Sequence, residues 1–224
     1  KRALFNTSIY AVIFAILYLF IDAARFSGSI AGIVDFELQK MILLSHLGVA
    51  KLMLILGLVA IMSSYRIALK SSIILAIIGV SLVAFSFTLT GHTLENPFRL
   101  ILAPLLMLHL FVVLFWFGAL IPLYFVVKLE ASKISGKIID DFSKKATLLV
   151  PLIFVAGIIM SVVLMEGLDF LRDSYGQILL FKIASFSLLM LIAALNKLRF
   201  GPDLKQGKPN AARNIARAII LEII

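Results

Sequence analysis

The sequence predicts an all-α protein, a polytopic transmembrane helical bundle with about seven spans. Two observations predict this class. Of the 224 residues, 62% are apolar and 15% are charged, whereas soluble domains are about 45–50% apolar and about 25% charged. The apolar residues also gather in runs of about 20 residues, the length that a helix needs to cross a bilayer. Because lipid offers the backbone no hydrogen-bond partner, each span is expected to be a helix.

Uncharged runs predict four spans, at residues 3–21, 71–94, 100–127 and 146–165. Two further spans are predicted over 46–65 and 175–196, and each carries one lysine inside it, Lys51 and Lys182 respectively. A seventh span begins near Asn214 and runs to the end of the chain. We expect residues 1–224 to form a single transmembrane domain, a fragment of a longer polypeptide in which the seventh span is cut at the C-terminus.

The charges between the spans predict their orientation. Fifteen of the 21 Lys and Arg residues precede span one or lie between spans two and three, four and five, and six and seven. Only four lie in the alternate loops. Because cytoplasmic loops carry the excess of Lys and Arg, the chain is expected to start inside, as a multi-pass protein of the cell inner (cytoplasmic) membrane. We therefore interpret the excess of Lys and Arg as a sign of membrane topology, and no nucleic-acid partner is expected.

The three histidines are the candidate metal ligands, and the predicted topology puts all of them in the outer half. His46 starts span two, His92 ends span three, and His109 lies about 13 Å down span four at about 1.5 Å per residue. Imidazole is the commonest metal ligand in proteins and suits copper. The absence of cysteine excludes thiolate sites. A hydrogen-bonding role at the interface or between helices is the alternative for each histidine.

The sequence also predicts the surroundings of four charged residues and of Trp116. Lys51 is expected to extend toward the outer surface, whereas Lys182 lies too deep and is expected to pair, with Glu222 as its candidate partner. Asp22 counts among the acids of the outer loops, which together predict a mildly anionic outer rim. Trp116 either packs beneath the histidines or belongs to the ordinary core.

The remaining motifs point to packing rather than to catalysis. The sequence contains no P-loop, no G-x-S-x-G and no H-E-x-x-H motif, so no enzyme activity is expected. Glycines in and beside the spans are expected to allow close packing of helices. They are Gly28, Gly32, Gly48, Gly57 and Gly157.

The stretch Thr90-Gly91-His92, followed by Leu108-His109, Trp116-Phe117-Gly118 and Pro122, resembles the membrane domain of the copper resistance protein D (CopD) family. The resemblance covers roughly residue 71 to the end of the chain. The second half adds Tyr175-Gly176, Lys182, Ala194-Leu195-Asn196-Lys197-Leu198-Arg199, Arg217 and Leu221-Glu222.

The resemblance implies an inner-membrane protein that moves copper from the periplasm toward the cytoplasm, often beside a periplasmic copper chaperone. The histidines of the family correspond to His92 and His109, whereas His46 has no counterpart in the family pattern. The expected function is therefore inward copper transport in copper resistance and homeostasis. The copper ion is expected to be held by His92, His109 and His46.

Other functions stay open at this point. The main alternative is a haem-binding electron-transfer protein, because two histidines on neighbouring helices can hold an iron axially. An enzyme that uses a membrane-embedded metal, and a sensor or partner subunit without transport activity, are further alternatives.

Overall fold

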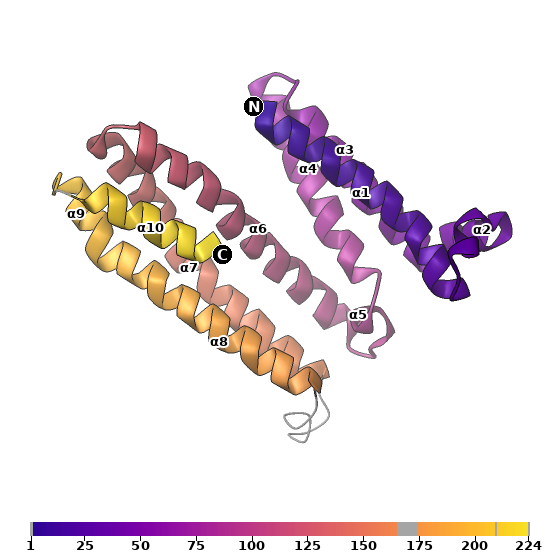
Figure 1. Ribbon diagram of the computed structural model, residues 1–224. Helices are drawn as coiled ribbons and strands as arrows, with labels where there is room; N and C mark the ends of the chain where they lie inside the picture. The colour runs from indigo at the N-terminus through magenta and orange to yellow at the C-terminus, as the bar shows by residue number, and fades with distance from the viewer. Residues whose placement is uncertain (1, 165–173, 209, 224) are drawn as a thin grey trace. The chain divides into compact units, whose positions relative to one another are not determined.

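The computed structural model describes residues 2–164, 174–208 and 210–223, and throughout these ranges the chain forms helices and turns without a strand. The side chains of residues 2–4, 69, 92, 93, 174 and 175 fall outside the description. The predicted helical bundle is confirmed (Figure 1). Its elements are α1 (Arg2–Ser27), η1 (Ile30–Val34), α2 (Phe36–Leu44), α3 (His46–Ser64), α4 (Leu69–Thr88), α5 (His92–Glu95), α6 (Arg99–Leu129), α7 (Ser132–Leu164), α8 (Ser174–Leu195), the π-helix η3 (Asn196–Phe200), α9 (Gly201–Lys205) and α10 (Ala211–Ile223).

The six complete spans predicted from hydropathy are confirmed as helices long and apolar enough to cross a membrane. They lie at Phe5–Ser27, His46–Ser64, Lys70–Thr88, Arg99–Leu129, Ser132–Leu164 and Gly176–Lys205. α10 is not among these six, and its 13 described residues include Arg213 and Arg217. The seventh span therefore stays a prediction.

Several predicted span ends are wrong. The fifth apolar helix starts at Ser132 rather than at residue 146, and the sixth runs to Lys205 rather than to residue 196. The first helix continues to Ser27, six residues beyond the predicted end. The predicted end preceded Asp22, but Asp22 forms an ion pair with Lys51 and lies within the helix.

The third span ends at Thr88 rather than at residue 94. Gly91 follows with a φ of 71°, a left-handed conformation that favours glycine and interrupts the helix. His92 therefore starts a separate short helix, α5, instead of ending the span.

The described chain divides into two compact units, Lys1–Phe111 and Val112–Ile224, with residues of α6 in both. The single transmembrane domain predicted over residues 1–224 remains a prediction. In unit one, α3 packs against both α1 and α4 (Figure 1). The α3–α4 crossing is close: a Cβ atom placed on Gly57 would lie 2.7 Å from the carbonyl oxygen of Gly79. Small residues let two membrane helices approach in this way.

The packing role predicted for glycines holds for three of the five. Hypothetical Cβ atoms on Gly32, Gly48 and Gly57 would all meet backbone atoms at less than 3 Å. For Gly28 and Gly157 the prediction is wrong, because no atom of the described residues lies within 4 Å of the corresponding Cβ position. Gly28 instead follows the end of α1 with a φ of 67°, which only glycine adopts readily.

Unit two is built around the second part of α6. Trp116, Leu120 and Leu123 follow one face of this helix and are buried in an apolar core. α10 contributes Ile215 and Ile219 to the same core and packs against α8 (Figure 1). The arginines of α10 are exposed, so this helix is amphipathic in the way expected of an element that covers a core with one face.

Candidate functional site

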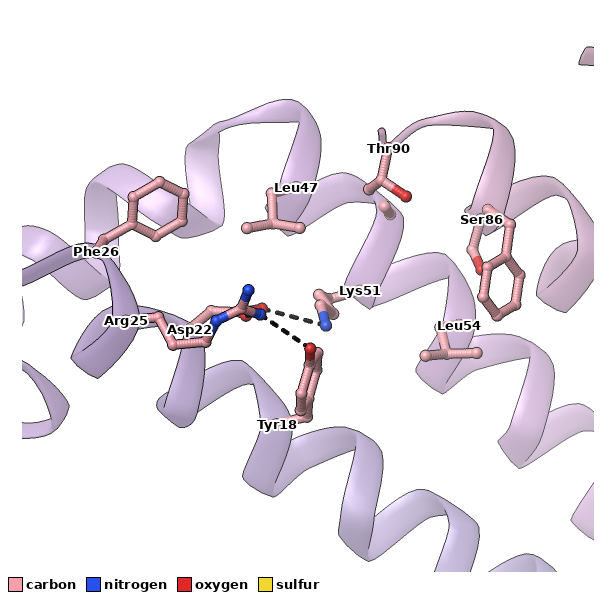
Figure 2. Close-up of a pocket in the computed structure, with 11 residues that line it drawn as sticks. Tyr18, Asp22, Arg25, Phe26, Leu47, Lys51, Leu54, Ser86 and Thr90 are labelled. Atoms are coloured by element: carbon pink, nitrogen blue, oxygen red, sulfur yellow. Dashed lines mark hydrogen bonds and ion pairs between the residues drawn. The ribbon is translucent and has the colours of Figure 1, made fainter. Parts of the chain in front are cut away.

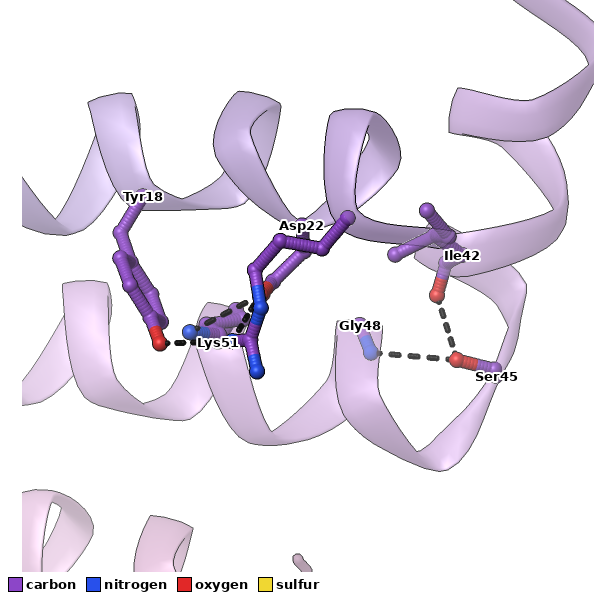
Figure 3. Close-up of polar contacts among 7 residues, drawn as sticks. Tyr18, Asp22, Ile42, Ser45, Gly48 and Lys51 are labelled. Carbon is purple, nitrogen blue, oxygen red and sulfur yellow. Dashed lines mark hydrogen bonds and ion pairs between the residues drawn. The ribbon is translucent and has the colours of Figure 1, made fainter. Parts of the chain in front are cut away.

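A cluster of charged side chains joins the end of α1 to the start of α3 in unit one (Figure 3). Lys51 Nζ lies 3.1 Å from Asp22 Oδ2, and Arg25 Nη1 lies 3.4 Å from Asp22 Oδ1. The side chains of Asp22 and Lys51 are only 6% and 12% exposed. Tyr18 completes the cluster: its hydroxyl accepts a hydrogen bond of 3.0 Å from Arg25, and its ring lies 3.6 Å from Lys51 Nζ.

This cluster corrects two expectations. Asp22 is not a solvated acid of the outer rim, because it is buried in α1 with a cation on each carboxylate oxygen. Lys51 does not extend to the surface, because Asp22 on the neighbouring helix compensates its charge inside the bundle. The contact to Oδ2 is an ion pair rather than a directed hydrogen bond, since no described residue hydrogen-bonds to that atom. The cluster therefore joins α1 to α3 and leaves no carboxylate oxygen without a nearby cation.

A cavity of about 540 Å³ opens beside this cluster (Figure 2). Residues of α1, of α3, and of the end of α4 and the turn after it line the cavity, and they include Leu47, Ser86 and Thr90. Leu47 directly follows His46 in the chain, and Thr90 lies two residues before His92. Two of the three candidate histidine positions therefore adjoin residues that line the same cavity.

The three histidines occupy different surroundings. His46 is exposed at the first position of α3, where the hydroxyl of Ser45 caps the helix by accepting a hydrogen bond from Gly48 N. His109 is half-buried in α6, and the side chain of His92 lies outside the described residues. Within the described ranges, no three His, Asp or Glu side chains form a group that could hold a metal ion. The role of these histidines as copper ligands stays a prediction.

A second cavity, of about 320 Å³, lies in unit two and contains a buried carboxylate. Glu222 on α10 is 5% exposed. Its Oε2 accepts a hydrogen bond of 3.3 Å from Nε1 of Trp116, and its Oε1 accepts one of 2.7 Å from Nδ2 of Asn196. Trp116 itself is 3% exposed and belongs to the core, as one of the two sequence interpretations expected.

The expected pairing of Lys182 with Glu222 is wrong. Lys182 is exposed on α8, and no ion pair joins it to Glu222 in the described part of the chain. The distance along the helix explains this result. Asn196, which contacts Glu222, lies 14 residues after Lys182, which corresponds to about 21 Å at about 1.5 Å per residue.

The backbone around Asn196 departs from a regular helix. Residues Asn196–Phe200 form a π-helix, in which Gly201 N donates to the carbonyl oxygen of Asn196. Pro202 follows and has no N–H, so the α-helical ladder cannot continue to the carbonyl of Leu198. π-Helical turns occur frequently at functional sites. Neither this turn nor the partners of Glu222 was predicted from the sequence, although one carboxylate in an apolar helix and one indole N–H were visible signals.

The comparison with protein families found a similarity in the C-terminal part of the chain. Residues 136–224 match the model of the family described as Copper resistance protein D. Neither a search of curated proteins nor a search of solved structures found a match. The matched range contains Asn196 and Glu222, whereas His92 and His109 precede it. Over residues 136–224 the chain is therefore similar to the copper resistance protein D (CopD) family, and the resemblance seen in the sequence is confirmed for this part of the chain.

Proposed function

We propose that this protein transports copper across the inner membrane, from the periplasmic or extracellular side toward the cytoplasm. The observation that carries the proposal is the match of residues 136–224 to the copper resistance protein D family. The six apolar helices are consistent with a transporter, since their length and composition suit a bilayer. The proposed direction comes from the family resemblance, and the proposed site from the predicted positions of the histidines.

The proposed entry site uses the histidines of unit one. In the predicted topology His46, His92 and His109 lie in the outer half, where an arriving copper ion would exchange water for imidazole nitrogens. The cavity lined by Leu47 and Thr90 supports this placement. Asp22 is already compensated by Arg25 and Lys51, so it is a poor ligand and leaves metal binding to the histidines. A periplasmic copper chaperone is the proposed partner on this side.

Copper uptake into liposomes tests the proposal. We expect the purified chain, reconstituted into vesicles, to accumulate copper, and His109→Ala to lower the uptake rate at least about tenfold, as loss of a metal-site group does. Leu108→Ala is the matched control, because it truncates the neighbouring residue on the same helix without removing an imidazole. An uptake rate for His109→Ala equal to that of the control would refute the site, and no uptake by the unsubstituted chain would refute transport.

The absorption spectrum of the same preparation tests the haem alternative. A copper transporter that lacks haem shows no Soret band, whereas a haem-binding electron-transfer protein shows one that disappears when an axial histidine is replaced.

A further inference from the structure

The cavity in unit two contains a buried carboxylate that the described residues leave without a cation. Both hydrogen bonds to Glu222 come from neutral donors, the indole of Trp116 and the amide of Asn196. The two lysines that line the same cavity are engaged elsewhere. Lys205 Nζ lies 2.9 Å from Asp140 Oδ1, and Lys197 donates a hydrogen bond of 2.7 Å to the hydroxyl of Thr147. A buried carboxylate is strongly unfavourable unless a cation or a proton compensates it.

Two further groups make the cavity suitable for a metal cation. The Oδ1 atom of Asn196 is buried and accepts no hydrogen bond from any described residue. Met190 belongs to the cavity lining and is the one residue with a sulfur atom among the described residues that line it. Thioether sulfur favours Cu(I), whereas carboxylate and amide oxygens are harder ligands that hold copper less tightly. A donor set of this composition would bind copper weakly.

We propose that Glu222, Asn196 and Met190 form a transient copper site in this cavity. The proposal rests on the proposed function, copper transport. Weak binding suits such a site, because a permeating ion must bind well enough to enter and weakly enough to leave. The basic residues between spans six and seven place α9 on the cytoplasmic side of the predicted topology. The site is therefore the inner stop of the ion, as the histidines are the outer one.

The fluorescence of Trp116 tests this site directly. Trp116 is the single tryptophan of the sequence, and its indole N–H contacts Glu222, so its emission reports on this carboxylate. We expect Cu(I), added anaerobically to the purified full chain, to change the emission in a saturable way. Glu222→Gln removes the charge and keeps the volume, and its amide can hydrogen-bond both neighbours after the Asn196 amide turns over. This variant should bind Cu(I) at least about tenfold more weakly.

The matched control is Glu130→Gln, which removes an exposed carboxylate that follows α6 in the same unit. It should bind Cu(I) as the unsubstituted chain does. Thermal unfolding shows whether each variant is folded. Met190→Leu, which conserves volume, provides a second test if Glu222→Gln does not fold, and it should also weaken the fluorescence response.

The outcomes separate this site from the transport proposal. Equal Cu(I) binding and equal copper uptake by Glu222→Gln and Glu130→Gln would overturn the site and leave transport standing, with Glu222 serving only to attach α10. Glu222-dependent Cu(I) binding in a chain that transports no copper would support the site and refute transport. An emission that responds to pH but not to Cu(I) would also overturn the site and would identify Glu222 as a proton acceptor.

Discussion

Asp22 and Glu222 are both buried acids, but their neighbours give them different roles. Asp22 has a cation beside each carboxylate oxygen, from Arg25 and Lys51, so its ionised form is compensated within unit one. Among the described residues, Glu222 has only neutral hydrogen-bond donors, and it lines a cavity. The first arrangement is typical of an ion pair that joins two helices, whereas the second leaves room for an exogenous cation.

The role assigned to Asp22 predicts a large effect on stability. Asp22→Asn leaves the ammonium of Lys51 buried without its counter-ion, so the free energy of unfolding should fall by about 3–5 kcal/mol. Thermal unfolding of the purified chain in detergent measures this loss. The double variant Asp22→Leu with Lys51→Met should recover most of it, because neither charge then remains.

An exposed ion pair supplies the control for this prediction. Oδ1 of Asp203, in α9, lies 2.6 Å from Nζ of Lys208, which follows this helix, and water reaches both side chains. Asp203→Asn should change stability little, because exposed pairs contribute little. A loss in Asp22→Asn no larger than that in Asp203→Asn would contradict the role of Asp22.

At the scale of the elements, the contact between α3 and α4 depends on two glycines that face each other. The Cβ position of each residue lies 2.7 Å from the carbonyl oxygen of the other, a distance that real Cβ atoms do not adopt. The two helices can therefore pack backbone to backbone only while both positions lack a side chain. Since membrane helices gain most of their association from close packing, this crossing is a main contact of unit one.

Gly57→Ala should accordingly lower stability by about 1–3 kcal/mol, the usual cost of overpacking. Gly157→Ala is the matched control, since Gly157 lies within α7 and none of the residues that the structure describes comes within 4 Å of its Cβ position. It should raise stability by up to about 1 kcal/mol, because alanine favours helix more than glycine does. Thermal unfolding measures both, and a Gly57→Ala variant as stable as Gly157→Ala would contradict the close crossing.

At the scale of the whole chain, the helices could be predicted from the sequence, but their partners could not. Hydropathy is a property of each segment alone, so the six spans followed from counting apolar residues. The partners of Asp22 and Glu222 depend on how each helix is rotated and how deep it lies, which composition does not encode. The sequence therefore missed the Asp22–Lys51 pair and assigned Glu222 to Lys182, about four helical turns from its contact.

The candidate site, too, could be predicted only in part. The histidines were recognisable as metal-ligand types, and the family resemblance was confirmed over residues 136–224, but a ligand type does not specify which rings converge. The π-helix at Asn196 was not predicted, because a helix that widens by one residue before Pro202 leaves the hydropathy pattern unchanged.

The orientation of the chain determines which cavity copper meets first, and the absence of cysteine makes it measurable. Single cysteines at three exposed positions, Ala31, Ala68 and Gln206, would report their side of the membrane through a thiol reagent that does not cross it. In intact cells we expect labelling of Ala31→Cys alone, with the other two labelled only after permeabilisation, because the basic loops stay inside. The reverse pattern would put the histidines of unit one at the cytoplasmic face and Glu222 in the outer half. Copper would then pass the two cavities in the opposite order, and the chain would export the ion rather than import it.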